Sequence, residues 1–557
     1  MDIQTWAFVF IASSFTLYLI IAVWAKAHTT ADFYIASGRI HPLTNGMAGA
    51  ANWMSAASFI SLAGMISLMG YDSSVYLMGW TGGFVLLALL LAPYLKQLGE
   101  YTVAGFFARR FGASARIVAV VFTVFISFVY VAGQMRGVGL VFARFLDVDI
   151  SLGVLLGMII VFVYAVWGGM KGITYTQVAQ YCVLIFAFLL PAFFTSFSLT
   201  GHWLPQLGLG ASLNDSNVYL LDKLDALSVE LGFSRFTESH QVILDRISIA
   251  AALMMGTAGL PHVITRFFTV ARVKDARISI AYALVFIALL YSVAPAVGAF
   301  AKVNIIQSIN GSELLGVAME HQPTWLENWQ QLSLVSWFDN NGDQRLFYSG
   351  DLRNEVFINQ DIVMLASPEL ADLPNWVVAL LAAGGLAAAL STAAGLVLVI
   401  SSTLAHDLIK QTYAKNLSER QELKIARISV VLVIVAAGYL GVRPPALVTE
   451  VVAIAFGLAA STLFPALIFG IFVRRIAWPA VLAGMLVGFG FSLFYIVFFK
   501  FLAVQYNHVD YWLFGISPEG IGSLGMLLNF STAWLLQYKC KPAPLSAQTM
   551  VLRLRRP

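Results

Sequence analysis

The chain has 557 residues, of which 59% are hydrophobic and only 11% are charged. Soluble proteins carry about 25% charged residues, so this composition excludes a soluble globular protein and indicates an integral membrane protein. The formal net charge is only +4 and the basic residues are divided among short loops, which implies no nucleic-acid partner.

Apolar stretches long enough to cross a bilayer, about 20 residues each, recur along the whole chain. We predict thirteen of them, with no large soluble domain between them. The predicted fold class is therefore an all-α, multi-pass protein embedded in the lipid bilayer. The predicted spans lie near residues 6–25, 43–69, 75–95, 117–146, 151–167, 175–199, 245–270, 279–302, 375–405, 425–441, 446–472, 478–500 and 515–537.

The flanks of the first span set the predicted topology. Asp2 precedes this span and Lys26 follows it, which is the reverse of a cleaved signal peptide. From there, alternate loops collect the basic residues, whereas the other set includes two long acidic loops near residues 201–243 and 303–374. By the positive-inside rule, the N-terminus lies outside and, after thirteen spans, the C-terminus lies in the cytoplasm.

Two of the predicted spans contain segments that disfavour a continuous helix. Residues 45–58 are rich in Gly, Ser and Asn, and residues 255–262 repeat that character five spans later. Glycine and proline interrupt a membrane helix where the freed backbone lines a cavity or contacts protein. Such a pair at corresponding positions of two halves predicts inverted repeats with a binding site near the bilayer midplane. The alternative is that these glycines only allow close helix packing.

Arg136 lies inside the fourth predicted span, where a charge costs about 2.5–3.5 kcal/mol even on lenient insertion scales. A small carboxylate substrate would offset this cost, because the guanidinium matches carboxylate geometry. We expect the substrate to meet Arg136 directly or through Gln134. The alternatives are that Arg136 extends toward the outer face, or that it pairs with Asp72, Asp245 or Glu450.

The long loop near residues 303–374 contains Asp339, Asn341 and Asp343, the spacing that opens a calcium-binding loop. Position six of that loop, where glycine is needed, is a glutamine, and position twelve, where glutamate is needed, is a glycine. We therefore predict a polar turn at this place.

The ninth predicted span carries a small polar face inside a long apolar run. Ala388, Ser391 and Thr392 are spaced i, i+3 and i+4, so one carbonyl and two hydroxyls share one side of a helix. Neutral oxygens in this arrangement suit a hard cation such as Na⁺. The alternative is that both hydroxyls bond back to carbonyls one turn earlier, as is common in membrane helices.

Several dispersed segments resemble the sodium:solute symporter family, and the resemblance covers nearly the whole chain. The family's first three cytoplasmic loops are similar to residues 32–39 (DFYIASGR), 102–112 (TVAGFFARRFG) and 167–172 (WGGMKG). Within the family, the acetate/glycolate permease branch is the one that this chain resembles at residues 54–59 (MSAASF) and 256–270 (GTAGLPHVITRFFTV).

The resemblance implies a LeuT-type core of two inverted five-helix repeats, formed by spans 2–6 and 7–11, with one helix before them and two after. The corresponding segments are 1–42 (first span and cytoplasmic loop), 43–200 (first repeat), 201–244 (outer loop), 245–472 (second repeat, with outer loop 303–374), 473–537 (two peripheral helices) and 538–557 (basic cytoplasmic tail).

The resemblance also implies the binding residues, with Na⁺ as the coupling ion and no other cofactor. The family's sodium site corresponds to the carbonyls of Ala51, Met54 and Ala388 and the hydroxyls of Ser391 and Thr392. Its substrate contacts near the two breaks correspond to Ser55, Ala56, Thr257 and Pro261, to which we add Gln134 and Arg136. His262, beside the second break, is interpreted as a packing residue rather than a proton relay.

The chain departs from the family pattern at three places. Gln177 stands where the family often has an acid, and Asn52 stands where acetate permeases carry Asp. Ser391 and Thr392 keep their oxygens where acetate permeases can have apolar residues. These departures favour Na⁺ over a proton as the coupling ion and indicate a sister branch of the acetate permeases.

The resulting hypothesis is a secondary transporter of the plasma membrane (the inner membrane in bacteria), not an enzyme. It would couple inward Na⁺ movement to uptake of a small, acetate-like monocarboxylate by alternating access. The alternative is a Na⁺-coupled symporter for an amino acid or another small solute, and a channel is less favoured. A membrane sensor is also less favoured, because the tail after residue 537 is shorter than a signalling domain of about 50–250 residues. A small membrane subunit as a partner stays open.

Overall fold

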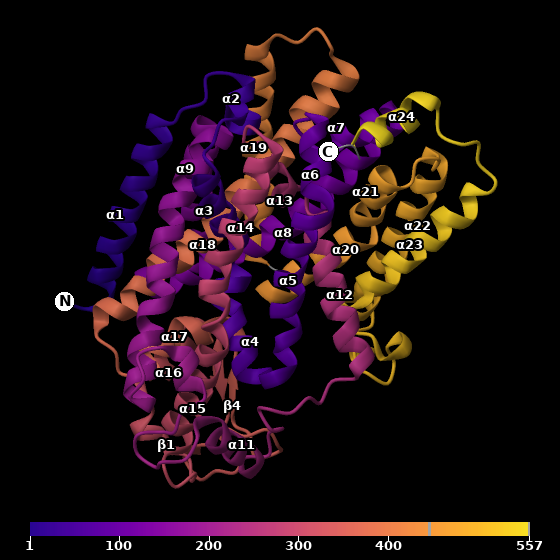
Figure 1. The fold of residues 1–557 in the computed structure, drawn as a ribbon. Coiled ribbons are helices and arrows are strands. Elements are labelled where there is room, and N and C mark those ends of the chain that lie inside the picture. Colours follow the sequence, from indigo (N-terminus) through magenta and orange to yellow (C-terminus); the bar gives the residue numbers. More distant parts are fainter. Residues whose placement is uncertain (444–446, 555–557) are drawn as a thin grey trace.

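The computed structural model describes residues 1–443 and 447–554. The predictions for residues 444–446, which end the loop after span 10 and begin span 11, and for 555–557, at the end of the basic tail, lie outside the described residues. The molecule is a bundle of long helices (Figure 1). The predicted outer loops gather at its lower end in Figure 1, around α11 (Leu220–Glu230) and α16 (Thr324–Gln330). The opposite end carries the short helices α2 (Thr30–Ile35), α7 (Val103–Phe111) and α24 (Leu545–Leu554).

In the described part of the chain, nine helical stretches are long and apolar enough to cross a membrane, or ten if one bent pair counts as a span. This result confirms a multi-pass helical membrane protein, and the number thirteen stays a prediction. The helices that build the bundle include α1 (Ile3–Trp24), α5 (Ser74–Leu86), α6 (Ala92–Leu98), α8 (Ala113–Leu146), α9 (Ile150–Thr200), α14 (Val273–Tyr291), α15 (Ala294–Asn310), α18 (Asn375–Ser402), α19 (Glu419–Val442), α20 (Val448–Ser461), α21 (Leu463–Phe472), α22 (Trp478–Val497) and α23 (Ile521–Gln537).

Helix α18 is the centre of the bundle. Its most apolar stretch is entirely buried, whereas the corresponding stretch of α1 is mostly exposed. It packs against α8 and α9 and against α1. A polar group on α18 therefore has only protein around it, which makes Ser391 and Thr392 depend on neighbouring helices for partners.

Local sequence accounts for where several helices begin. Thr102 accepts a hydrogen bond from the Gly105 N–H at 2.9 Å and so caps α7. Ser418 and Gln421 form a reciprocal capping box at the start of α19. Proline occupies the first turn of α3 (Pro42–Trp53), where its missing N–H costs nothing.

Both predicted interruptions are present. Helix α3 ends at Trp53, Met54 has a non-helical ψ of 77°, and the chain resumes as a π turn followed by α4 (Leu62–Met69). Helix α12 (Ile243–Gly259) is followed by Leu260 with ψ 121° and by α13 (Pro261–Ile264), with a bend of 48°. The second break follows from Pro261, because proline forces the residue before it out of the helical region.

Glycines in the interrupted segments allow neighbouring helices to pack closely, which is the alternative role considered for them above. A Cβ atom on Gly46 would lie 2.6 Å from the Tyr282 Cβ, and one on Gly256 would lie 2.2 Å from the Phe456 carbonyl oxygen. The breaks themselves lie several residues further on. The glycines and the breaks are therefore separate features of the same segments.

The outer loop 303–374 contains structure that the all-α prediction does not include. Strand β1 (Val317–Ala318) pairs antiparallel with β3 (Arg345–Leu346), and β2 (Val335–Trp337) pairs antiparallel with β4 (Val356–Ile358). The predicted polar turn lies between β2 and β3. In it the Asp339 carboxylate accepts hydrogen bonds from the N–H groups of Gly342 at 2.7 Å and Gln344 at 3.1 Å. The remaining short helices are α10 (Pro205–Leu209) and α17 (Val363–Leu370).

Candidate functional site

The two hydroxyls on α18 meet the end of the first broken helix. Ser391 Oγ donates to the carbonyl of Ala51 at 2.7 Å and to that of Ala388 at 2.8 Å. Thr392 Oγ1 donates to the carbonyl of Asn52 at 2.9 Å and to that of Ala388 at 3.3 Å. The predicted back-bonding within α18 and the predicted contact with α3 are thus both present.

The carbonyls that these hydroxyls meet belong to the last turn of α3. The last carbonyls of a helix have no partner within the helix and carry its partial negative charge. The Met54 N–H donates to the Ala50 carbonyl, and the Ser55 N–H donates to the Trp53 carbonyl. The carbonyls of Ala51 and Asn52 instead accept hydrogen bonds from the hydroxyls of α18. The result is a buried set of five neutral oxygens with partial negative charge, a donor set that suits Na⁺.

The predicted ligand set is only partly brought together. Ala51, Ala388, Ser391 and Thr392 share one hydrogen-bonded cluster. The Met54 carbonyl lies at the break, and within the described residues no hydrogen bond joins it to the hydroxyl pair. The Asn52 carbonyl takes a place in the cluster that the sequence reasoning did not assign.

Gln177, on α9, connects this cluster to a buried guanidinium. Its Nε2 donates to the Ser391 carbonyl at 2.6 Å and to Asn52 Oδ1 at 3.1 Å. Its Oε1 accepts from Arg266, which also donates to Thr174 Oγ1 at 2.9 Å. Arg266 is only 4% exposed and forms no ion pair with a carboxylate in the described part of the chain. The side-chain amide of Gln177 thus separates the fixed positive charge of Arg266 from the oxygen cluster around Ser391 and Thr392.

The segment after the second break is held to the predicted cytoplasmic end of the bundle. Asn45 Nδ2 donates to the Arg266 carbonyl at 3.1 Å, and Thr269 Oγ1 donates to Asn45 Oδ1 at 2.7 Å. Ile40 N–H donates to the Thr269 carbonyl at 3.0 Å, and Lys96 Nζ donates to carbonyls on either side of it. The crevice beside Asn45 and Arg266 measures about 10 Å³, roughly the space of a single water. These contacts pack the segment after the second break closely against this end of the bundle.

The first break is stabilised by α8. Gln134 Oε1 accepts from the Ala56 N–H at 2.9 Å, which satisfies a backbone group freed by the interruption. A Cβ atom on Gly137 would lie 2.6 Å from the Ala56 Cβ, so this glycine lets α8 approach the break. Gln134 is fully buried, and its Nε2 has no hydrogen-bond partner among the described residues. An amide donor is therefore aimed into the break without an acceptor.

Arg136 lies on a different face of α8 from Gln134, because residues two positions apart in a helix are separated by about 200° around its axis. It is partly exposed and interacts electrostatically with Asp361. Burial raises the pKa of the Asp361 carboxyl, and the charge of Arg136 partly opposes this shift. The sequence reasoning did not name Asp361, and within the described residues Arg136 forms no ion pair with a carboxylate. The acids it did name interact elsewhere: Asp72 with Arg246, Asp245 with Ser517, and Glu450 with Lys500.

An aromatic cluster surrounds the two breaks. The Tyr130 ring lies 5.3 Å from the ring of His262 and 5.6 Å from that of Phe456, measured between centroids. Phe456 in turn lies 5.8 Å from Trp53 and 6.3 Å from Trp80. Tyr130 is one turn before the buried amide of α8, so the cluster and that amide share one face. We call these five side chains the aromatic cluster.

Several N–H donors in and beside the aromatic cluster are buried without partners. In the described residues, neither ring nitrogen of His262, nor Trp80 Nε1, nor Gln134 Nε2 forms a hydrogen bond. Unpaired buried donors are rare and costly, so each calls for an explanation such as a ligand or an ordered water. His262 does pack against Tyr130, as expected for a packing residue.

The remaining predicted substrate residues lie at the breaks. Ser55 and Ala56 follow the end of α3 and are buried. Pro261 begins α13. Thr257 is buried on α12, but its hydroxyl donates to the Leu253 carbonyl at 2.7 Å and so is engaged within its own helix.

A cavity of about 400 Å³ opens toward the predicted outer end. Tyr76 lines it, and the Tyr76 ring contacts that of Trp80 at 5.8 Å. The cavity therefore ends at the aromatic cluster. This cavity and the packed segment around Asn45 and Arg266 lie at opposite ends of the bundle.

This architecture agrees with comparisons to known proteins. The profile of the sodium:solute symporter family matches residues 33–317 and 355–488, which is well over half of the chain. The chain belongs to the sodium:solute symporter family. An uncharacterized symporter from Cupriavidus necator is 33% identical to this symporter, with 94% of this chain and 90% of that protein covered. The uncharacterized symporter YwcA from Bacillus subtilis is 30% identical, with 86% and 84% covered.

The fold also has a solved counterpart. A Na⁺-coupled sialic acid symporter in a substrate-bound, outward-open state superposes with a TM-score of 0.70 at 14% identity, covering 97% of this chain and 99% of that one. The symporter is therefore a helical, multi-pass membrane transporter with a LeuT-like fold, and not an enzyme. Family membership gives Na⁺ as its coupling ion and places it in the plasma membrane.

Proposed function

We propose that the symporter couples inward Na⁺ movement to uptake of a small monocarboxylate by alternating access. The observation that carries the proposal is the meeting of Ser391 and Thr392 with the free carbonyls at the end of α3. In this proposal Na⁺ binds to the oxygens of Ala51, Ala388, Ser391 and Thr392, and a small rotation at the break brings in Met54.

The unpaired donors support an anionic substrate. Gln134 Nε2, Trp80 Nε1 and one of the two His262 ring nitrogens offer unpaired N–H groups at the aromatic cluster. A carboxylate has two acceptor oxygens and would satisfy such donors. The rings are in contact with one another, so a solute bound beside them has to be small, which supports an acetate-like acid rather than a bulky one. The motif resemblance of residues 54–59 and 256–270 to acetate/glycolate permeases points the same way.

The thirteen-span topology belongs to the same proposal. The stretch α9 has 51 residues, which as one straight helix would measure about 77 Å, more than twice the hydrocarbon thickness. Its kink at Gly169, with φ 53° and ψ −157°, supports a division into spans 5 and 6. Repeats over residues 43–200 and 245–472 would then each hold one broken helix, with the N-terminus outside and the C-terminus in the cytoplasm.

Uptake into proteoliposomes tests the proposed function. We expect labelled acetate, pyruvate or lactate to accumulate under an inward Na⁺ gradient, and amino acids not to accumulate. An H⁺ gradient alone should give no accumulation, and protein-free liposomes supply the baseline. Accumulation of amino acids instead of acids would favour the alternative substrate class, and uptake driven only by H⁺ would contradict the coupling.

The fixed charge of Arg266 gives a further prediction. We expect Arg266→Gln to lower the Na⁺ concentration for half-maximal uptake by about three- to tenfold, because a like charge worth about 1 kcal/mol is removed from the vicinity of the ion. The maximal rate should fall at the same time, since the contacts of the Arg266 side chain with Thr174 and Gln177 on α9 are lost. Arg266→Lys keeps the charge and should keep the Na⁺ dependence of the wild type. An unchanged Na⁺ dependence in Arg266→Gln would show that the guanidinium does not influence the ion.

A further inference from the structure

A second cavity, of about 300 Å³, lies at the predicted outer end, apart from the aromatic cluster. It is enclosed by α4, α15 and two outer-loop segments near residues 228–241 and 350. Among its lining residues are Ser67, Asp72, Gly232, Phe233, Lys302 and Gly350. None of the proposed Na⁺ or substrate residues lines it.

Lys302, on α15, is the unusual member of this cavity. It is only 3% exposed, and its Nζ lies 3.8 Å from the Phe233 ring centroid and 5.3 Å from that of Tyr348. Within residues 1–443 and 447–554 its ammonium forms no ion pair and donates no hydrogen bond. Cation–π contacts compensate part of the charge but leave the three N–H donors without acceptors. A buried ammonium in this state is costly, and an acceptor bound in the cavity would offset that cost.

Ser67 supplies a second unsatisfied polar group in the same cavity. Its side chain is fully buried, and Ser67 Oγ has no partner among the described residues. The preceding residue, Ile66, packs tightly on Gly298, where a Cβ atom would lie 2.6 Å from Ile66 Cγ2. Lys302 follows Gly298 by one helical turn on the same face of α15. The ammonium and the hydroxyl therefore emerge from the same helix–helix contact.

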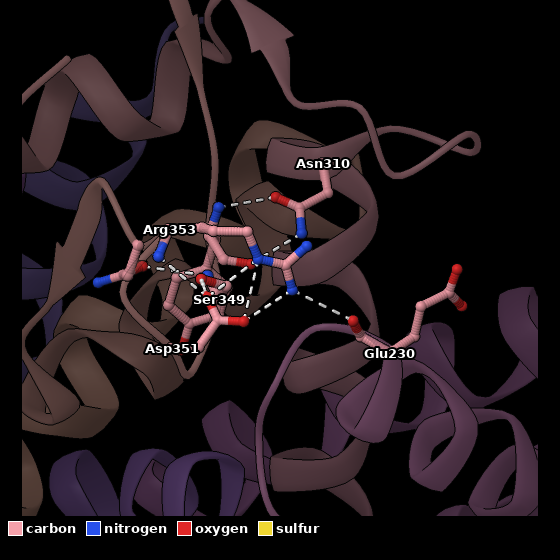
Figure 2. Close-up of polar contacts among 7 residues, drawn as sticks. Glu230, Asn310, Ser349, Asp351 and Arg353 are labelled. Carbon is pink, nitrogen blue, oxygen red and sulfur yellow. Dashed lines mark hydrogen bonds and ion pairs between the residues drawn. The ribbon is translucent and has the colours of Figure 1, made fainter. Parts of the chain in front are cut away.

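The roof of the cavity is held by a hydrogen-bonded network (Figure 2). Asn310 Oδ1 accepts a hydrogen bond from the Tyr348 N–H, and Asn310 Nδ2 donates one to the Tyr348 carbonyl, both at 2.8 Å. Arg353 pairs with Asp351 at 2.8 Å and donates to the Glu230 carbonyl at 3.4 Å, which ties the two loops together as Figure 2 shows. The rings that flank the ammonium are thus fixed in position, and the cavity is a built feature of the fold.

The other charges near the cavity are already compensated. The Asp72 carboxylate accepts from Ser239 Oγ at 2.5 Å and from the His240 N–H at 2.9 Å, and Arg246 lies 3.9 Å away. Arg235, which also lines the cavity, forms an ion pair with Glu238 at 2.9 Å. The uncompensated charge is that of Lys302, so the missing partner is an anion.

We propose that this cavity is a second, outer binding site for a small monovalent anion, either chloride or a short carboxylate. The anion accepts hydrogen bonds from the Lys302 ammonium and the Ser67 hydroxyl. The inference is independent of which solute the symporter carries, because it uses no residue of the transport site.

Thermal unfolding of the purified full-length symporter tests the proposal. Na⁺ concentration and ionic strength are held constant while a bulky anion, gluconate, is replaced by chloride in one arm and by acetate in the other. We expect at least one of these anions to raise the unfolding midpoint of the wild type by about 1–3 °C. The arm that responds identifies the anion.

Variants assign the response to this cavity. Lys302→Gln should abolish it and Lys302→Arg should retain it. Lys500→Gln is the matched control, because Lys500 is already paired with Glu450 at 3.0 Å and Glu519 at 2.8 Å, and it should respond as the wild type does. If Lys302→Gln does not fold, Ser67→Ala should shift the half-saturating anion concentration upward several-fold. A wild type that responds to neither anion, or a response that Lys302→Gln or Ser67→Ala leaves unchanged, overturns the proposal.

Discussion

Ser391→Ala is expected to raise the Na⁺ concentration for half-maximal uptake by at least about tenfold, and the double variant with Thr392→Ala should abolish Na⁺-driven uptake. Each substitution removes one oxygen ligand and leaves a buried carbonyl of α3 without its hydroxyl partner. A contact between a neutral polar group and a charge is worth about 1.5–3 kcal/mol, so the loss of one oxygen ligand corresponds to roughly a ten- to 150-fold change in affinity. Initial rates of substrate uptake measured over a range of Na⁺ concentrations give the shift directly.

A serine on the same helix provides the matched control. Among the described residues, Ser402 Oγ donates only to the Val399 carbonyl, at 3.0 Å and one turn back within α18. Ser402→Ala therefore removes a hydroxyl from the same helix without touching α3, and we expect the wild-type Na⁺ dependence. Equal shifts in Ser391→Ala and Ser402→Ala, or none in Ser391→Ala, would contradict a cation site between α3 and α18.

The hydroxyl pair could be predicted from sequence because helix spacing alone puts Ala388, Ser391 and Thr392 on one face. The partner carbonyls could not be predicted in the same way. Every residue has the same carbonyl, and which one lacks a partner depends on where α3 ends. No proline marks that end, so the role of the Asn52 carbonyl emerges only from the non-helical Met54. The second break could be predicted, because Pro261 dictates it.

Charged and amide groups within the spans show another limit of sequence reasoning. Arg136 was the evident intramembrane charge, yet Arg266 is the buried one and contacts Gln177 beside the cation cluster. The sequence signal for Arg266 was available, since it lies in the segment after the second break. The partners of Arg266 could not be predicted from sequence, because Gln177 and Arg266 are brought together only by the packing of α9 against the broken helix. The departure from an acid at position 177 thus accompanies a buried cation that an acid would have neutralised.

The small strands of the outer loop and the tail helix α24 were also absent from the prediction. Strands of two or three residues carry too few positions for a period-2 pattern to be recognised. Their pairing depends on contacts between distant parts of the loop, such as Val317 with Leu346. Hydropathy, by contrast, fixes membrane helices well, because the bilayer requires every backbone group to be satisfied within the helix.

Gln134→Met is expected to lower the efficiency of carboxylate uptake by about 30- to 100-fold. The variant keeps the side-chain length but removes the Nε2 donor that we assign to the substrate, and a hydrogen bond to a charged group is worth about 1.5–3 kcal/mol. It also leaves the Ala56 N–H without its acceptor, so the break itself is weakened. Uptake rates of labelled acid at saturating Na⁺ measure the loss, and stabilisation of the purified protein by Na⁺ shows that the cation site is still formed.

Arg136→Gln separates the two candidates for the substrate's anchor. Since Arg136 faces away from Gln134 and interacts with Asp361, its neutralisation should cost far less than the Gln134 substitution. If instead Arg136→Gln abolishes uptake while Na⁺ still stabilises the protein, and Gln134→Met transports acids normally, then the guanidinium is the anchor. That outcome would require α8 to rotate during the transport cycle, because only a turn of about 200° brings the two side chains to the same place.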